Sequence, residues 1–165
     1  MREKQNKMMR SLTFLQLAIS FVFALAFLAG STMMGAPTKG KTFAQALIEE
    51  TVAKHPELEG IGLGTTPPDG KKCVNIADTH KKEIGDECDK GELSVIKTGK
   101  STIEKESDAY DVTVPLQVSG KTIGTIGLDF KLDQQESGLL ERANTIAKEI
   151  ESQLPSKAKL FEEAK

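Results

Sequence analysis

YDVTVPLQVSGKTIGTIGLDFK, residues 110–131, reads as two long strands joined by a tight turn. Apolar and other residues alternate from Ala109 to Val118, which is typical of a strand with one buried face. Ser119-Gly120 supplies the turn, and Thr122 to Lys131 alternates again. The stretch therefore predicts an antiparallel hairpin at the centre of a sheet.

Three shorter segments before this hairpin predict further strands. Ser101 to Lys105 is expected to pair with the outer side of 109–118. Residues 59–63 and 72–77 flank the turn Thr65-Thr66-Pro67-Pro68-Asp69-Gly70, whose composition is that of a tight connection. They predict a second hairpin, so that the sheet has five antiparallel strands.

Helical periodicity marks the two ends of this region. Residues 42–55 carry an apolar stripe behind a capping Thr42, and residues 134–154 carry one that ends at Pro155. A short helix is expected at 92–98, ended by Gly99. The order predicts an α+β domain over 37–155, a five-stranded antiparallel sheet with N- and C-terminal helices, followed by a charged tail over 156–165.

Residues 1–36 have the features of an export signal. A basic start is followed by an almost wholly apolar stretch, residues 12–29, and then by small residues. This stretch is also long enough to span a bilayer, so an uncleaved N-terminal anchor is the alternative to a signal peptide. Either way we expect the domain to be periplasmic or secreted, or anchored at the inner membrane and facing away from the cytoplasm.

The chain has two cysteines, Cys73 and Cys88, and they flank most of a polar segment, residues 78–91. Their even number in an exported chain favours a disulfide. Free thiols are one alternative. A metal site that includes His80 is another, but it would have at most three ligands at a spacing that fits no standard zinc pattern. We expect no metal, and a long loop over 78–91 that the disulfide holds.

Composition and motifs exclude several classes of function. The net charge is −2 without a basic block, and Trp is absent, which argues against nucleic acid as a partner and against aromatic stacking platforms. Glycine recurs at every second position from Gly60 to Gly64, but Pro67-Pro68 blocks the helix that a dinucleotide loop needs. No serine or cysteine has the context of a nucleophile. We therefore expect a protein that is not an enzyme and uses no cofactor.

The element order resembles the extracytoplasmic PAS-like sensor fold, the Cache or PDC type of bacterial receptors. The resemblance rests on IGLGTTPPDGKKCVNIADTH (61–80), LSVIKTGKSTIEKE (93–106) and the closing hairpin 110–131. It implies that a small molecule binds between the sheet and the layer formed by the loop and the short helix. Relatives commonly drive a transmitter module, whereas no second span or output domain follows Leu154, and no amino-acid-binding signature is present.

Candidate ligand contacts follow from this position. Asp78 and His80 lie at the mouth of the long loop, where His80 could contact an anionic ligand or be a solvated loop residue. Tyr110 shares the apolar strand face and is either core or a ligand contact. Thr113 and Asp129 lie on the sheet as further candidates.

These features predict a stand-alone exported domain that binds a small molecule and signals through conformation or partner contact. The partner is a separate signalling protein or a second copy paired through helix 134–154. The membrane is contacted only through residues 12–29 if they are uncleaved. The alternative is a non-catalytic structural or interaction module of the envelope, anchored by its N-terminal helix.

Overall fold

The computed structural model describes residues 40–165. The expected signal or anchor, residues 1–36 with the apolar stretch 12–29, lies outside the described residues. Within 40–165, no helix combines the length and the apolar character that a membrane span requires.

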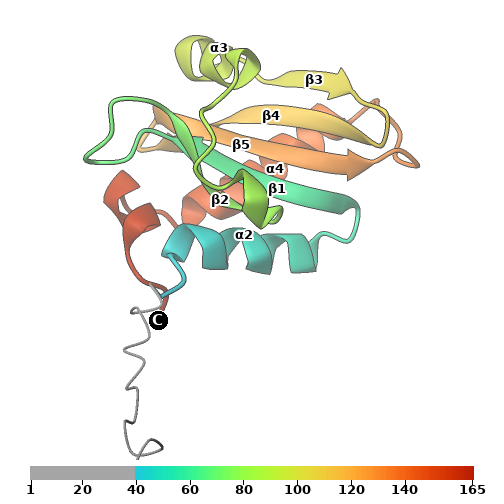
Figure 1. Ribbon diagram of the computed structural model, residues 1–165. Helices are drawn as coiled ribbons and strands as arrows, with labels where there is room; N and C mark the ends of the chain where they lie inside the picture. Colours follow the sequence, from blue (N-terminus) through green and yellow to red (C-terminus); the bar gives the residue numbers. More distant parts are fainter. Residues whose placement is uncertain (1–39) are drawn as a thin grey trace, which may run out of the picture. The chain divides into compact units, whose positions relative to one another are not determined.

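One antiparallel sheet of five strands organises the described chain (Figure 1). Its spatial order is β2-β1-β5-β4-β3, so the first hairpin joins the last hairpin through the pairing of β1 with β5. The strands are β1 (Leu58–Thr65), β2 (Val74–Asp78), β3 (Thr102–Lys105), β4 (Ala109–Val118) and β5 (Lys121–Lys131). The predicted α+β class and five-stranded antiparallel sheet are confirmed.

The long hairpin behaves as its alternation predicts. Val112, Val114 and Leu116 on β4 are fully buried, as are Ile126, Leu128 and Phe130 on β5. Between the strands, Ser119 and Gly120 both have positive φ, 53° and 75°. That is the geometry of a hairpin turn whose twist matches the strands that it joins.

Two helices cover one face of the sheet and enclose the hydrophobic core. Helix α2 (Phe43–Lys54) packs on β1 and β2, and helix α4 (Leu139–Ser152) packs on β4 and β5. Thr42 caps α2 as expected, because its hydroxyl accepts a hydrogen bond from the Gln45 amide at 3.2 Å. The apolar residues of both helices meet the even-numbered β4 and β5 side chains in one cluster.

Helix α4 begins five residues later than the expected start at 134. The helical stripe is correct, but Gly138, with φ of 98°, precedes the first helical residue, and the chain over 132–138 forms turns. The left-handed backbone at Gly138 is incompatible with a helix that runs through it.

The segment after Pro155 packs against the domain. It forms the short helix η2 (Lys157–Phe161), whose Leu160 is fully buried in the core. The Phe43 amide donates to the Glu162 carbonyl at 2.7 Å, and the Ala164 amide donates to the Lys41 carbonyl at 2.8 Å. The chain after residue 155 therefore packs against the rest of the described domain.

The opposite face of the sheet carries the shorter elements. These are the loop after β2, with the single turn η1 (Lys81–Glu83), and helix α3 (Lys90–Thr98), which lies above β4 and β5 in Figure 1. Helix α3 starts two residues before the expected helix, at an Asp89 cap. It ends at Gly99, whose φ of 67° is the left-handed conformation of a helix C-cap.

Candidate functional site

Strand register brings chemically distinct residues into rows on the sheet face opposite α2 and α4. One row runs Gly62, Gly127, Thr113, and the next row runs Gly60, Asp129, Asp111. Successive residues of a strand point to opposite faces, so these rows are the complement of the buried apolar face. A cavity of ≈ 180 Å³ lies over them.

Glycine makes the floor of this cavity deep. A Cβ at Gly127 would meet no atom within 4 Å, so the space above it is open. A Cβ at Gly62 would lie 2.7 Å from Asp78 Oδ2, so the missing side chain lets that carboxylate lie over β1. Thr113 completes the floor with a side chain that is only 6 % exposed.

Asp78 is held at the end of β2 by a core helix. The Gln45 side chain on α2 donates to the Asp78 carbonyl at 2.9 Å and accepts from the Asp78 amide at 3.1 Å. The carboxylate, itself buried, accepts from the His80 amide at 2.6 Å and from Asn75 Nδ2 at 2.5 Å. This part of the rim is therefore fixed to helix α2, which packs on the hydrophobic core.

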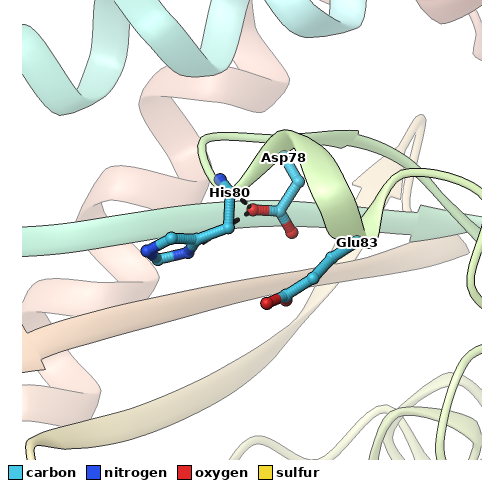
Figure 2. Close-up of side chains that lie close together, drawn as sticks. All are labelled: Asp78, His80 and Glu83. Carbon is cyan, nitrogen blue, oxygen red and sulfur yellow. Dashed lines mark hydrogen bonds and ion pairs between the residues drawn. The ribbon is translucent and has the colours of Figure 1, made fainter.

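The rim also contains the one metal-like group found among the described residues. One ligand atom each from Asp78, His80 and Glu83 lies within 4.8 Å of the others (Figure 2). His80 Nδ1 is 3.7 Å from Asp78 Oδ1, and the His80 ring is about half exposed. Each Asp78 oxygen already accepts one hydrogen bond and keeps a further lone pair with which it could contact a cation.

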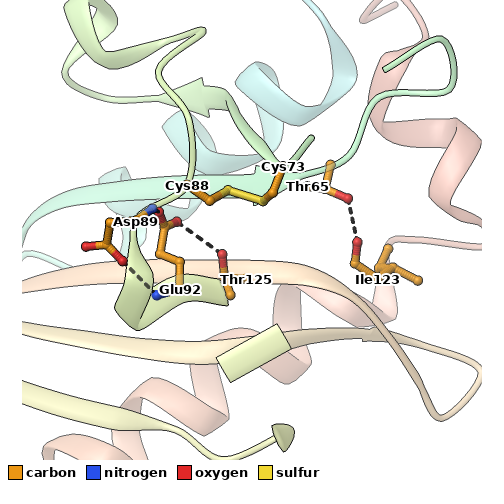
Figure 3. Close-up of a disulfide and its surroundings, with 7 residues drawn as sticks. All are labelled: Thr65, Cys73, Cys88, Asp89, Glu92, Ile123 and Thr125. Atoms are coloured by element: carbon orange, nitrogen blue, oxygen red, sulfur yellow. Dashed lines mark hydrogen bonds between the residues drawn. A yellow bond between two sulfur atoms is a disulfide. The ribbon is translucent and has the colours of Figure 1, made fainter. Parts of the chain in front are cut away.

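Helix α3 closes the other side, next to the disulfide of Cys73 and Cys88 (Figure 3). Asp89 and Glu92 form a capping box, with each carboxylate accepting from the other residue's amide at 2.8 and 2.9 Å. The second Glu92 oxygen accepts from the Thr125 hydroxyl at 3.2 Å, which ties the helix to the sheet. The disulfide, with Cα atoms 5.3 Å apart, joins the start of β2 to the residue before Asp89.

Asp111 and Asp129 form the most unusual pair of the site, since they are direct cross-strand neighbours. Burial, followed by the charge of Asp129, raises the pKa of Asp111 to about 7. Burial also raises the pKa of Asp129, and the charge of Asp78 adds to this, although nearby His80 acts in the opposite direction. Like charges directly opposite each other destabilise a sheet, so the pair favours a proton or a bound cation.

Three of the five residues named from the sequence line this cavity, and a fourth lies beside it. Asp78, Thr113 and Asp129 line it, and His80 lines an adjoining hollow of ≈ 380 Å³ that shares Asp111 and Asp129. Tyr110 lies elsewhere: it points to the core face, is 7 % exposed and packs with the hydrophobic cluster. Its position on the even-numbered face of β4 supports the core interpretation.

Sequence reasoning missed Asp111, Asn75, Glu83, Asp89 and Glu92 as part of the site. Asp111 carried a usable signal, because it alternates with the apolar residues just as Thr113 does. The capping pattern Asp89-x-x-Glu92 was a second signal, since it marks the start of a helix beside the loop.

No protein-family model matches the sequence, and no curated protein matches it. Solved structures do resemble its fold. The GAF domain from Acinetobacter phosphoenolpyruvate-protein phosphotransferase has 11 % identity and a TM-score of 0.50, covering 66 % of this chain and 78 % of that one. The GAF domain of nlh2 from A. aeolicus, in an inactive state, has 14 % identity and a TM-score of 0.51, covering 64 % and 80 %.

A further likeness is more distant. The periplasmic domain of RsbU from Chlamydia trachomatis has 16 % identity and a TM-score of 0.40, covering 87 % of this chain and 53 % of that one. Sequence identities this low support a shared fold only, so function has to be argued from the residues of the site. The described chain therefore has a GAF/PAS-like α+β fold, with its cavity on the sheet face that α2 and α4 leave open.

Proposed function

We propose that the protein is an exported sensor-like domain of the Cache type that binds a small molecule between its sheet and the β2–α3 layer. The observation that carries the proposal is the cavity above Gly62, Gly127 and Thr113, whose floor is a row of the sheet. Concave sites with a few convergent polar groups are where proteins bind small molecules.

The surroundings of the cavity support a signalling role. Three hydrogen bonds connect its rim to the rest of the fold: two between the Gln45 side chain and the Asp78 backbone, and one from the Thr125 hydroxyl to Glu92. A ligand that contacts both the sheet and α3 would change how this helix sits on β4 and β5. The ligand state would then be passed on by conformation or through a partner that contacts the α3 side, including a second copy of the chain.

Export is supported by the basic and apolar pattern of residues 1–36 and by the disulfide, a bond typical of oxidising compartments. Intact-mass measurement of the native protein, with and without reduction, tests this part. A released chain begins after residue 30 or 36 and gains two mass units on reduction. A full-length mass with free thiols would contradict export with cleavage and a disulfide.

The binding site is tested by filling the cavity without disturbing the sheet. Gly127→Val places a side chain into open space on a strand, where β-branched residues are favoured. Thr122→Val on the same strand, near the β4–β5 turn, is the matched control. Thermal-shift screening of the purified protein with small amines, acids and purines should give hits that Gly127→Val abolishes and Thr122→Val keeps. A screen without hits, or hits that Gly127→Val leaves intact, would refute binding in this cavity.

A further inference from the structure

The walls of the cavity carry one sign of charge. Its lining includes six carboxylates and no lysine, arginine or histidine side chain: Asp78, Glu83, Asp89, Glu92, Asp111 and Asp129. The basic groups of this region, His80 and Lys82, line the adjoining hollow instead. Low-dielectric walls of one sign concentrate ions of the opposite sign, so this space attracts cations.

Several acceptors in the cavity lack a donor within the described chain. Neither Asp111 nor Asp129 has a hydrogen bond or ion pair with another described residue, although each is partly buried on the sheet. The side-chain oxygen of Asn75 is shielded from solvent and likewise has no partner in 40–165. Buried polar atoms are normally hydrogen-bonded. The shielded Asn75 oxygen and the two unpaired carboxylates therefore leave acceptors available to a ligand that supplies N–H donors.

Thr113 adds an observation that is independent of the acidic groups. Its side chain is more than nine-tenths buried and lines the cavity, and no described residue bonds its hydroxyl. Asn75 Oδ1 is the one buried polar side-chain atom without a partner in 40–165, so the unbonded Thr113 hydroxyl reaches the open space of the cavity, where a ligand can bond it. The sheet thus presents a polar anchor at the floor, between the two glycines of its row.

An anionic ligand finds little to bind here. The N-terminus of α3 could offer free amides to an anion. However, the capping box already occupies the amides of Asp89 and Glu92 with carboxylate oxygens. The His80 ring lies at the side of the cavity, beside the Asp78 carboxylate.

A bare metal ion fits the pair Asp111 and Asp129 poorly. In the described part of the chain, the group with metal-like spacing is Asp78, His80 and Glu83, and it includes neither Asp111 nor Asp129. Hard cations need several oxygen ligands in close geometry. An ammonium or guanidinium group instead needs two or three separate acceptors, and these acceptors are already arranged around the cavity.

We propose that the cavity binds a small organic cation through primary ammonium or guanidinium groups, with Asp111 and Asp129 as its counter-ions and Thr113 as its floor contact. The proposal rests on the function proposed above and gives that site its ligand class. The volume of ≈ 180 Å³ suits a ligand of few heavy atoms. Ion pairing with the cation offsets the repulsion between the two aspartates, so that both can be ionised at opposite positions of neighbouring strands.

Titration calorimetry at pH 8 with the purified full chain tests the ligand class. The probes are 1,4-diaminobutane, succinate as the anion with the same four-carbon backbone, and calcium chloride. We expect 1,4-diaminobutane to bind at one site with a Kd below about 1 mM, and the other two probes not to bind. Asp129→Asn should weaken diamine binding at least tenfold, whereas Asp69→Asn, an equal charge change in the exposed β1–β2 turn, should not.

Each other outcome has a definite meaning. Succinate or a neutral compound that binds wild type but not Gly127→Val would overturn the cation assignment and leave the binding function intact. Calcium binding that depends on Asp129 would also overturn it, in favour of a metal site. Failure of every probe and every screened compound would remove the proposed function itself. Thermal unfolding of each variant shows that a loss of binding is not a loss of fold.

Discussion

Replacing Asp111 by Asn should stabilise the protein, and only at neutral to basic pH. In the folded chain, burial and the facing Asp129 raise the pKa of Asp111 from its usual 3.8 to about 7. The folded state thus binds this proton more tightly than the unfolded chain does. The resulting stability is fully present below pH 3.8 and is lost as the pH rises through 7.

The size of the effect follows from the pKa difference. At 1.36 kcal/mol for each pKa unit, the shift corresponds to at most about 4 kcal/mol at pH 8. Because Asp111 is partly exposed, solvent screening reduces this value, and we expect about 1–2 kcal/mol. Asp111→Asn removes the charge but keeps the shape, so the variant should be more stable than wild type by this amount at pH 8.

Urea unfolding at pH 8 and at pH 4.5 measures the difference. At pH 4.5 the wild-type side chain is protonated in the folded state, whereas the unfolded chain, with its usual pKa of 3.8, is still mostly ionised. The gap should therefore shrink to about half of its pH 8 value or less. Asp69→Asn, in the exposed turn after β1, is the control and should change stability by less than about 0.5 kcal/mol at either pH. An Asp111→Asn variant that is no more stable than wild type at pH 8, or equally stabilised at both pH values, would refute the reasoning.

Three further predictions concern the loop, the ligand and the tail. Replacing Cys73 and Cys88 together by Ser should cost about 3 kcal/mol in urea unfolding, because the bond closes a loop with a sequence separation of 15; an unchanged midpoint would show that the bond does not stabilise the fold. Affinity for 1,4-diaminobutane should be weaker at pH 5.5 than at pH 8, by up to about 30-fold, since the cation competes with a proton on Asp111, whose pKa is raised to about 7; a pH-independent Kd in calorimetry would contradict this. The other charged groups that act on the pKa values of Asp111 and Asp129 are Asp78, His80, Glu83, Asp89, Glu104 and Glu106. Leu160→Ala should destabilise the protein by about 2–5 kcal/mol in thermal unfolding, whereas a loss below about 0.5 kcal/mol would mean that the segment after Pro155 is not part of the core.

Local patterns were sufficient to predict most of the fold. β4 occupies the expected residues because strict alternation and the Ser119-Gly120 turn are both local signals. Helix α2 differs from the expected range by one residue at each end, with Thr42 and Pro56 marking its limits. The start of α4 was misplaced because Gln134 to Gly138 has helix-compatible composition, and only the backbone of Gly138 shows that the chain turns there.

The site was harder to predict because it depends on pairing between distant strands. The register that sets Asp111 opposite Asp129, and Thr113 opposite Gly127, is a tertiary property. Alternation did place Thr113 and Asp129 on the open face, and the loop placed Asp78 and His80 at its edge. The alternation could not show that Tyr110 faces the core. It assigns Tyr110 to the apolar face of the strand, but it does not say which layer covers that face.

Amide-resolved NMR titration with small organic molecules tests most directly whether the open face of the sheet is a binding site. For wild-type protein, a binding compound should shift the amide signals of Gly62, Thr113 and Gly127, which form the cavity floor. Gly127→Val should keep the folded spectrum and lose these shifts. Shifts confined to the outer surfaces of α2 and α4, or the same response in Gly127→Val, would contradict a ligand site on this face of the sheet.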